Sequence, residues 1–215
     1  MNRNESQPVI ELVVYTLDPQ KRPDNEFITS DMNRRLKDEY AGFQHRDTFF
    51  ADENAHLMMD YCLWENAELA HQAAENIQQD EHMMPFMAAI SGVSTFGHYL
   101  PVSVFSPSDA VDSESVTKLV QYTVTEANRT SFLKASNALD QKLAAFPGFI
   151  ERRIYQSIED PSLFADIVRC DTLANAEAIR EALQNDTEAA GFFGLIESVK
   201  HSLHFHPLTA VEHAG

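Results

Sequence analysis

The chain has 215 residues, of which 44% are hydrophobic and 23% are charged, a balance that is ordinary for a globular protein. Its formal net charge of −17 should repel nucleic acid and anionic membranes, so neither is expected as a partner. No apolar segment follows the N-terminal residues as it would in a signal peptide, and no run approaches the roughly 18 apolar residues of a membrane span. Cys62 and Cys170 both lie in apolar, strand-like runs, which favours buried, reduced thiols. We therefore expect a cytoplasmic protein.

The first half of the chain predicts strand, helix, strand, strand, helix and strand, in that order. Strands are expected where β-branched and apolar residues gather, over residues 9–17, 43–50, 56–64 and 93–105. Helices are expected over residues 27–40, 65–79 and 80–90. Gly42 should end the first helix, Asn66 should cap the second, and Pro85 should interrupt the short third one.

The second half of the chain repeats the first. Residues 42–101 align without a gap with residues 148–207, and 15 of these 60 pairs are identical. Upstream of Gly42 the shift is 107 instead of 106, and it places Tyr15 over Tyr122. The identical pairs include Arg46 and Arg152, Asp60 and Asp166, and His98 and His204. The repeat predicts a first module at residues 1–105, a polar linker at 106–115 and a second module at 116–215.

The element order of each module is typical of the ferredoxin-like βαββαβ pattern. The expected fold class is α+β, with a four-stranded antiparallel sheet in each module and helices on one face of it. The other face must be covered, because it would otherwise remain an exposed apolar patch. We therefore expect two tandem ferredoxin-like modules packed as an intramolecular dimeric α/β barrel. This pseudo-dimer within one chain could pair again as a homodimer.

At this level the chain resembles the dimeric α/β-barrel superfamily, and within it the antibiotic-biosynthesis-monooxygenase-like proteins. The resemblance rests on the element order, on the Gly42-Phe43 pair that opens the second strand, and on the strand that ends at Trp64 before an Ala-rich helix. Such proteins often oxidise aromatic polyketides with dioxygen and without metal or flavin, with a Trp in the cleft. The resemblance implies that Trp64 occupies this place. Its counterpart is Cys170, so the implied site exists once, in the first module.

Three residues of the first module are candidates for catalysis, namely Trp64, Asp60 and His98. Strand alternation places Asp60 on one face with Met58, Cys62 and Trp64, where a carboxylate is costly unless it is paired. Asp60 is therefore either an ion-pair partner of an arginine such as Arg46 or a functional carboxylate. His98 could move a proton, and Trp64 could equally be a core anchor.

Three further residues, Tyr15, Tyr122 and His204, are candidates for binding a substrate. The two tyrosines are matched positions that could orient a polar group or simply fill the core. His204 and His206 share one strand face, where they could bind a metal, although no recognised metal motif accompanies them.

No nucleotide fingerprint, P-loop, nucleophile elbow or HExxH motif occurs, so no cofactor is expected. The resemblance implies a cofactor-independent, monooxygenase-like enzyme that acts on a small apolar or aromatic molecule. The alternative is a non-catalytic small-molecule-binding or stress-response protein of the same fold. An enclosed pocket beside Trp64 would favour the enzyme, and an interior filled by Phe and Met would favour the alternative.

Overall fold

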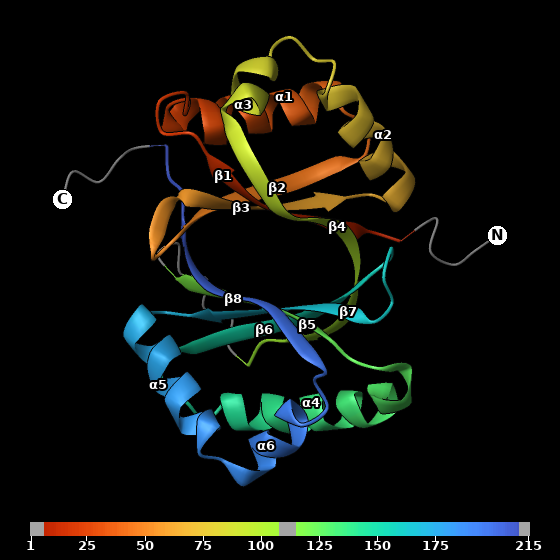
Figure 1. Cartoon of the computed structure of the whole chain (residues 1–215), viewed down its shortest axis with the longest axis vertical. Helices are drawn as coiled ribbons and strands as arrows, with labels where there is room; N and C mark the ends of the chain where they lie inside the picture. Colours follow the sequence, from red (N-terminus) through yellow and green to blue (C-terminus); the bar gives the residue numbers. More distant parts are fainter. Residues whose placement is uncertain (1–6, 108–114, 211–215) are drawn as a thin grey trace. The chain divides into compact units, whose positions relative to one another are not determined.

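The computed structural model describes residues 7–107 and 115–210 (Figure 1). Its contacts divide the chain into two compact units, residues 1–100 with 207–215, and residues 101–206. Most of the predicted linker, residues 108–114, lies outside the described residues. Each unit contains a four-stranded antiparallel sheet with helices on one face, as Figure 1 shows. The α+β class and the ferredoxin-like order predicted from the sequence are confirmed.

In the first unit the strands lie in the order β4, β1, β3, β2. These strands are β1 (Val9–Leu17), β2 (Phe43–Ala51), β3 (Asn54–Trp64) and β4 (Ile90–Phe105), and the last one continues into the second unit. A π-helical turn, η2 (Phe27–Asp31), leads into α1 (Met32–Glu39), and α2 (Ala67–Ile77) and α3 (Met84–Ala89) follow β3.

In the second unit the strands lie in the equivalent order β8, β5, β7, β6. They are β5 (Val116–Thr123), β6 (Phe149–Ser157), β7 (Leu163–Cys170) and β8 (Ser198–Pro207). A short 3₁₀ turn, η3 (Glu126–Asn128), precedes α4 (Arg129–Leu143), and α5 (Leu173–Gln184) and α6 (Thr187–Phe193) lie between β7 and β8. No helix in the described part of the chain is long and apolar enough to cross a membrane.

The strand registers confirm the internal repeat. Val9 pairs with Trp64 between β1 and β3, and Val116 pairs with Cys170 between β5 and β7. The matched carboxylates and histidines follow the same rule: Val13 pairs with Asp60 and Val120 with Asp166, while Glu11 pairs with His98 and Lys118 with His204. A side chain in one unit therefore has a defined counterpart in the other, and differences between counterparts can be compared directly.

The local signals that end the helices are mostly as expected. Asn66 caps α2, because its Oδ1 accepts the Leu69 backbone N–H at 3.0 Å. Gly42 and Gly148 adopt φ angles of +80° and +76°, a left-handed conformation that favours glycine and ends the preceding segment. The expectation for Pro85 was wrong: this proline lies in the first turn of α3, where no intrahelical partner is needed for a backbone N–H.

A buried arginine–aspartate pair ties the sheet to the helices in each unit. Arg46 Nη2 donates to Asp60 Oδ2 at 3.0 Å, and its Nη1 donates to the Ile28 carbonyl at 2.7 Å. In the second unit Arg152 Nη2 donates to Asp166 Oδ2 at 2.7 Å, and Nη1 donates to Asp140 Oδ1 of α4 at 2.8 Å. Because all these groups are buried, each charge depends on its partner.

A second, more exposed ion pair is also repeated. Arg35 of α1 contacts Asp80 at 2.7 Å, and the equivalent Lys142 of α4 contacts Asp186 at 2.6 Å. The Arg35 hydrogen bonds hold the pKa of Asp80 well below its usual range. Each pair links the first helix of a unit to the start of its last one.

We expect Asp60→Ala to lower the free energy of unfolding by about 3–5 kcal/mol, because it leaves the buried Arg46 without a carboxylate. Asp166→Ala should lower it by less, because Arg152 keeps its ion pair with Asp140. Asp31→Ala is the matched control: its contact with Arg34 is exposed and should contribute only about 0–1 kcal/mol. Urea denaturation followed by circular dichroism measures both. Equal effects of the buried and the exposed changes would contradict this assignment.

Candidate functional site

The structure gives Asp60 a structural partner. Besides the ion pair with Arg46, its Oδ1 accepts the Thr48 hydroxyl at 2.8 Å. This is the first of the two roles that the sequence left open. Trp64 is 1% exposed and packs edge-on against Phe43, with ring centroids 5.4 Å apart. Its indole N–H is buried and has no hydrogen-bond partner in the described part of the chain.

His98 lies on β4 beside β1, where its Nε2 is 3.3 Å from Glu11 Oε2. Both side chains are almost fully buried, and the exposed His71 of α2 packs on the His98 ring at a centroid distance of 4.3 Å. The histidine is therefore fixed against a carboxylate of the same unit. Among the described residues, His98 makes no hydrogen bond or ring contact with Asp60 or Trp64.

The two matched tyrosines lie in equivalent cores. Tyr15 packs edge-on against Phe86 at 5.6 Å, and burial raises the pKa of its hydroxyl well above the usual value. The Tyr122 hydroxyl donates to Asp166 Oδ2 at 3.2 Å, and burial followed by the Asp166 charge raises its pKa as well. Neither phenol is therefore a ready source of phenolate at neutral pH.

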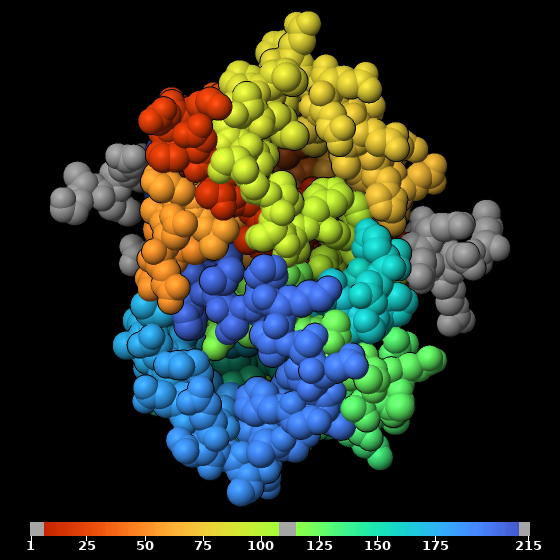
Figure 2. Space-filling model, viewed as in Figure 1, coloured from red at the N-terminus to blue at the C-terminus, as the bar shows by residue number. Residues whose placement is uncertain are grey.

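The second unit contains a cavity of about 350 Å³ between the helix-covered face of its sheet and helices α4, α5 and α6. Figure 2 shows a hollow in this unit, between the lighter blue atoms of α5 and the deeper blue atoms of β8. The walls are mainly apolar, and they include Val120, Leu139, Ile179, Leu183, Phe192 and Ile196. Of the six candidate residues from the sequence, Tyr122 is the one that lines this cavity.

The repeat explains why space exists at this position. Cys170 lines the cavity at the place that the indole of Trp64 takes in the first unit, because both residues pair with the matched valines of the first strand of each unit. A thiol is much smaller than an indole. The replacement therefore leaves volume between sheet and helices that the first unit fills with an aromatic ring.

One part of the cavity wall is a fixed polar network. Arg152 Nε lies 3.0 Å from Asp166 Oδ1, and the Arg152 guanidinium also lies over the Phe192 ring at 5.0 Å. Asp140 and Tyr122 complete the network. Arg152 and Tyr122 already donate hydrogen bonds to the Asp166 oxygens, so this carboxylate is paired within the protein.

Two other cations line the cavity, and they have no such partners. Lys118 of β5 and Arg180 of α5 make no hydrogen bond and no ion pair with any residue that the structure describes. Burial lowers the pKa of the Lys118 ammonium, and the charge of Arg180 lowers it further. Burial, followed by the Asp171 charge, raises the pKa of the nearby Cys170 thiol to about 11.

The cavity is better suited to an organic molecule than to a metal centre. The groups of the lining that could bind a metal are Cys170, Tyr122 and Asp166, and Asp166 is already paired with Arg152. The lining includes no histidine. His204 pairs with Lys118 across the β5–β8 ladder but does not line the cavity, and the metal site suggested by His204 and His206 stays a prediction.

Sequence reasoning missed Lys118 and Arg180, although the alignment contains a signal for both. Their counterparts in the first half are Glu11 and Ala74, so each cation is specific to the second copy. The identical pairs in the alignment identify residues that maintain the fold shared by the two units. The positions at which the copies differ, here Glu11/Lys118 and Trp64/Cys170, mark where the second unit departs from it.

No protein-family model and no curated protein sequence matches the chain. Among solved structures, it is similar to an anthrone oxidase-like protein, with a TM-score of 0.73 and 16% identity over 96% of this chain and 93% of the other. It is similar to chlorite dismutase from Candidatus Nitrospira defluvii, with a TM-score of 0.65 and 12% identity over 96% and 93% of the two chains.

A third similar structure is a ferredoxin-fold protein from Listeria monocytogenes related to antibiotic biosynthesis monooxygenases, with a TM-score of 0.54 and 10% identity. The match covers 94% of this chain and 96% of the Listeria protein. Together these likenesses support the ferredoxin-like fold of the two units.

The lowered pKa of Lys118 predicts that this residue destabilises the empty protein at neutral pH. The native state disfavours the ammonium, so stability should rise as the pH increases from the lowered pKa towards the usual value of 10.5. Lys118→Met removes the free-energy cost of burying the ammonium. It should raise Tm by about 2–4 °C, the effect of about 1 kcal/mol in a chain of this size.

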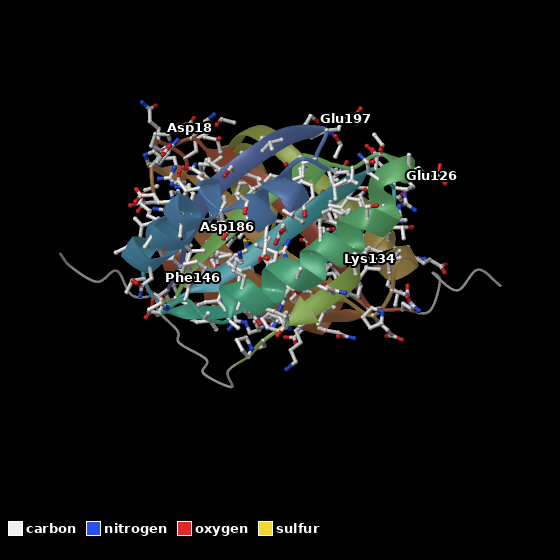
Figure 3. All side chains as sticks on the ribbon, turned by 90° about the horizontal axis from the view of Figure 1, so that it is seen from below. Asp18, Glu126, Lys134, Phe146, Asp186 and Glu197 are labelled. Atoms are coloured by element: carbon white, nitrogen blue, oxygen red, sulfur yellow. The ribbon has the colours of Figure 1, made fainter. Side chains whose placement is uncertain are left out.

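The matched control is Lys134→Met, because Lys134 is exposed on α4 (Figure 3). This change should leave Tm within about 1 °C, since surface substitutions are usually near neutral. Scanning calorimetry at pH 7 compares the two variants. A lower Tm for Lys118→Met would show that the lysine has a stabilising partner and would contradict our assignment.

Proposed function

We propose that the chain is a cofactor-independent, monooxygenase-like enzyme that oxidises a small apolar or aromatic molecule in the cavity of its second unit. The observation that carries this proposal is the cavity itself. Its volume of about 350 Å³ is within the range of small-molecule sites, and its walls are apolar with a few polar groups at defined places. The fold likeness to an anthrone oxidase-like protein supports the same reaction class.

The chemistry requires a proton acceptor and a dry site. An aromatic substrate with an acidic C–H or O–H group loses that proton and becomes an electron-rich anion, which can transfer an electron to dioxygen and then bond to it. For anthrone the balance is one anthrone and one dioxygen giving one anthraquinone and one water. Apolar walls such as Ile179 and Phe192 would exclude bulk water from the anion.

Lys118 is the group in the cavity that is best suited to accept the proton. The pKa of Lys118 is lowered, so its neutral amine is more populated than in an exposed lysine. No carboxylate among the described residues forms an ion pair with it. Asp166 is committed to Arg152 and Tyr122. The neutral amine would take the substrate proton, and the ammonium that results, which is the form that binds anions, would then hold the new anion.

The first-unit set of Trp64, Asp60 and His98 stays a rival prediction for the site. Its support is the place of Trp64 in the family resemblance and the unpartnered indole N–H. Arg46 donates a hydrogen bond to Asp60, and His98 Nε2 lies 3.3 Å from Glu11 Oε2, so our proposal assigns both polar residues to the support of the first unit. Substitutions in the two units can separate these alternatives.

Oxygen uptake in the presence of anthrone tests the proposal, with the spontaneous oxidation of anthrone subtracted. We expect Cys170→Trp to abolish catalysed uptake, because it places the first unit's indole in the second unit's cavity. Lys118→Met should lower kcat by about 100-fold or more, the usual contribution of a general base. Trp64→Phe should leave uptake within about twofold.

The opposite ranking, loss in Trp64→Phe and normal uptake in Cys170→Trp, would move the site to the first unit. Binding of anthrone without any uptake above the spontaneous rate would favour the non-catalytic alternative. Circular dichroism of each variant verifies that a loss of uptake does not reflect a loss of folding.

A further inference from the structure

We infer that Lys118 and Arg180 form an anion subsite at the cavity, so that the ligand of this protein is an aromatic molecule bearing an acidic group and is held in its anionic form. This inference rests on the proposed cavity site and specifies the class of molecule that the cavity selects. It does not depend on whether the bound molecule is oxidised.

The charged residues that line the cavity are not all paired with one another. The charged lining consists of Lys118, Arg152, Arg180 and Asp166. Asp166 is paired with Arg152, which donates hydrogen bonds of 2.7 to 3.1 Å to it. Asp140 also accepts a hydrogen bond from Arg152. Glu177 of α5 acts on Lys118 only at a distance, so Lys118 and Arg180 are the lining cations without an ion pair among the described residues. Lys118 is partly buried, and a partly buried cation without a partner is costly unless something else supplies the opposite charge, whereas Arg180 is exposed and adds positive charge beside it.

The partly buried Lys118 differs from the buried and partly buried cations that form ion pairs elsewhere in the described residues. The protein has 33 acidic and 16 basic residues, so carboxylates are abundant. Arg35, Arg46, Lys142 and Arg152 are all paired with an aspartate. Lys118 and Arg180 remain without an ion pair among the described residues, although they lie close enough for the charge of Arg180 to act on Lys118. Two unpaired like charges beside an apolar space are the pattern expected of an anion site.

The internal repeat shows which residues at the cavity are specific to the second unit. In the first unit, Glu11 occupies the position of Lys118 and contacts His98, and Ala74 occupies the position of Arg180. The same unit has Trp64 where the second unit has Cys170. The second copy therefore differs by a gain of volume and by a gain of two positive charges at the same cavity. One ligand with an aromatic body and an acidic group accounts for both differences.

The surroundings of Lys118 set the pH dependence of this site. The titratable or charged groups that face it are Arg180 and Glu177 of α5, Asp166 and Cys170 of β7, and His204 across the β5–β8 ladder. Burial is the main reason for its lowered pKa, so the ammonium is lost at a lower pH than in an exposed lysine. The preference for an anion should therefore weaken as pH rises through the lowered pKa of Lys118, while Arg180 stays charged.

The test is calorimetric titration of the full chain with two probes of equal shape, naphthalene-2-carboxylate and naphthalene-2-carboxamide, at pH 7. The wild-type protein should bind the carboxylate at least about tenfold more tightly than the carboxamide, as charged hydrogen bonds in a partly buried site allow. Lys118→Met and Arg180→Met should each remove about tenfold of carboxylate affinity and change carboxamide affinity by less than about twofold. Lys118→Arg should keep the preference and extend it to higher pH.

Two controls locate the effect. Lys134→Met removes one positive charge from an exposed position on α4 and should leave both affinities unchanged (Figure 3). Cys170→Trp should abolish binding of both probes, because it fills the cavity. Arg180 is exposed, so its replacement also gives an answer if Lys118→Met fails to fold.

The outcomes separate the anion subsite from the proposed function. Equal affinities of the two probes, or equal losses in Lys118→Met and Lys134→Met, would overturn the subsite and leave the cavity as a site for uncharged molecules. Absence of binding by either probe, or unchanged binding in Cys170→Trp, would overturn the cavity site and the subsite together.

Discussion

The buried ion pair between an arginine of the second strand and an aspartate of the third is the interaction on which each unit depends. Arg46 reaches from the sheet to the Ile28 carbonyl of the helical layer, and Arg152 reaches Asp140 of α4. A buried guanidinium tolerates few rearrangements, because every displaced hydrogen bond leaves a charge unpaired in a medium of low polarity. This constraint holds the helices at a fixed place above the sheet, and side chains elsewhere in the layer can then change without loss of the fold.

In the second unit, side chains between the sheet and the helices have changed while the ion pair is kept. The Arg152–Asp166 pair and Tyr122 are preserved, and beside them Cys170 and Lys118 replace a tryptophan and a glutamate of the first unit. The first unit uses its layer as a core, with Trp64 against Phe43 and His98 against Glu11. The second unit uses the same layer as the wall of a cavity. Within one chain, one copy therefore serves as the reference against which the functional changes of the other can be identified.

The fold could be predicted from the sequence because its signals are local or repeated. Strand periodicity, the Asn66 cap, the glycines at 42 and 148 and the constant shift between the halves are all visible without coordinates. The ion-pair role of Asp60 was also open to prediction, because a carboxylate among apolar neighbours demands a partner. Pro85 was misplaced by one turn, since a proline at the start of a helix and one that interrupts it look alike in sequence.

The cavity could not be predicted in the same way, because volume is a property of packing among β5, β7, α5 and α6, which no local pattern encodes. The account of its charge is tested most directly by titrating ¹³C-methylated lysines by NMR, with and without naphthalene-2-carboxylate. It predicts that Lys118, assigned through Lys118→Arg, titrates below the usual lysine value of about 10.5 when the cavity is empty, and that its pKa rises when the carboxylate binds. A Lys118 signal that titrates like the exposed lysines and does not respond to the probe would contradict the account.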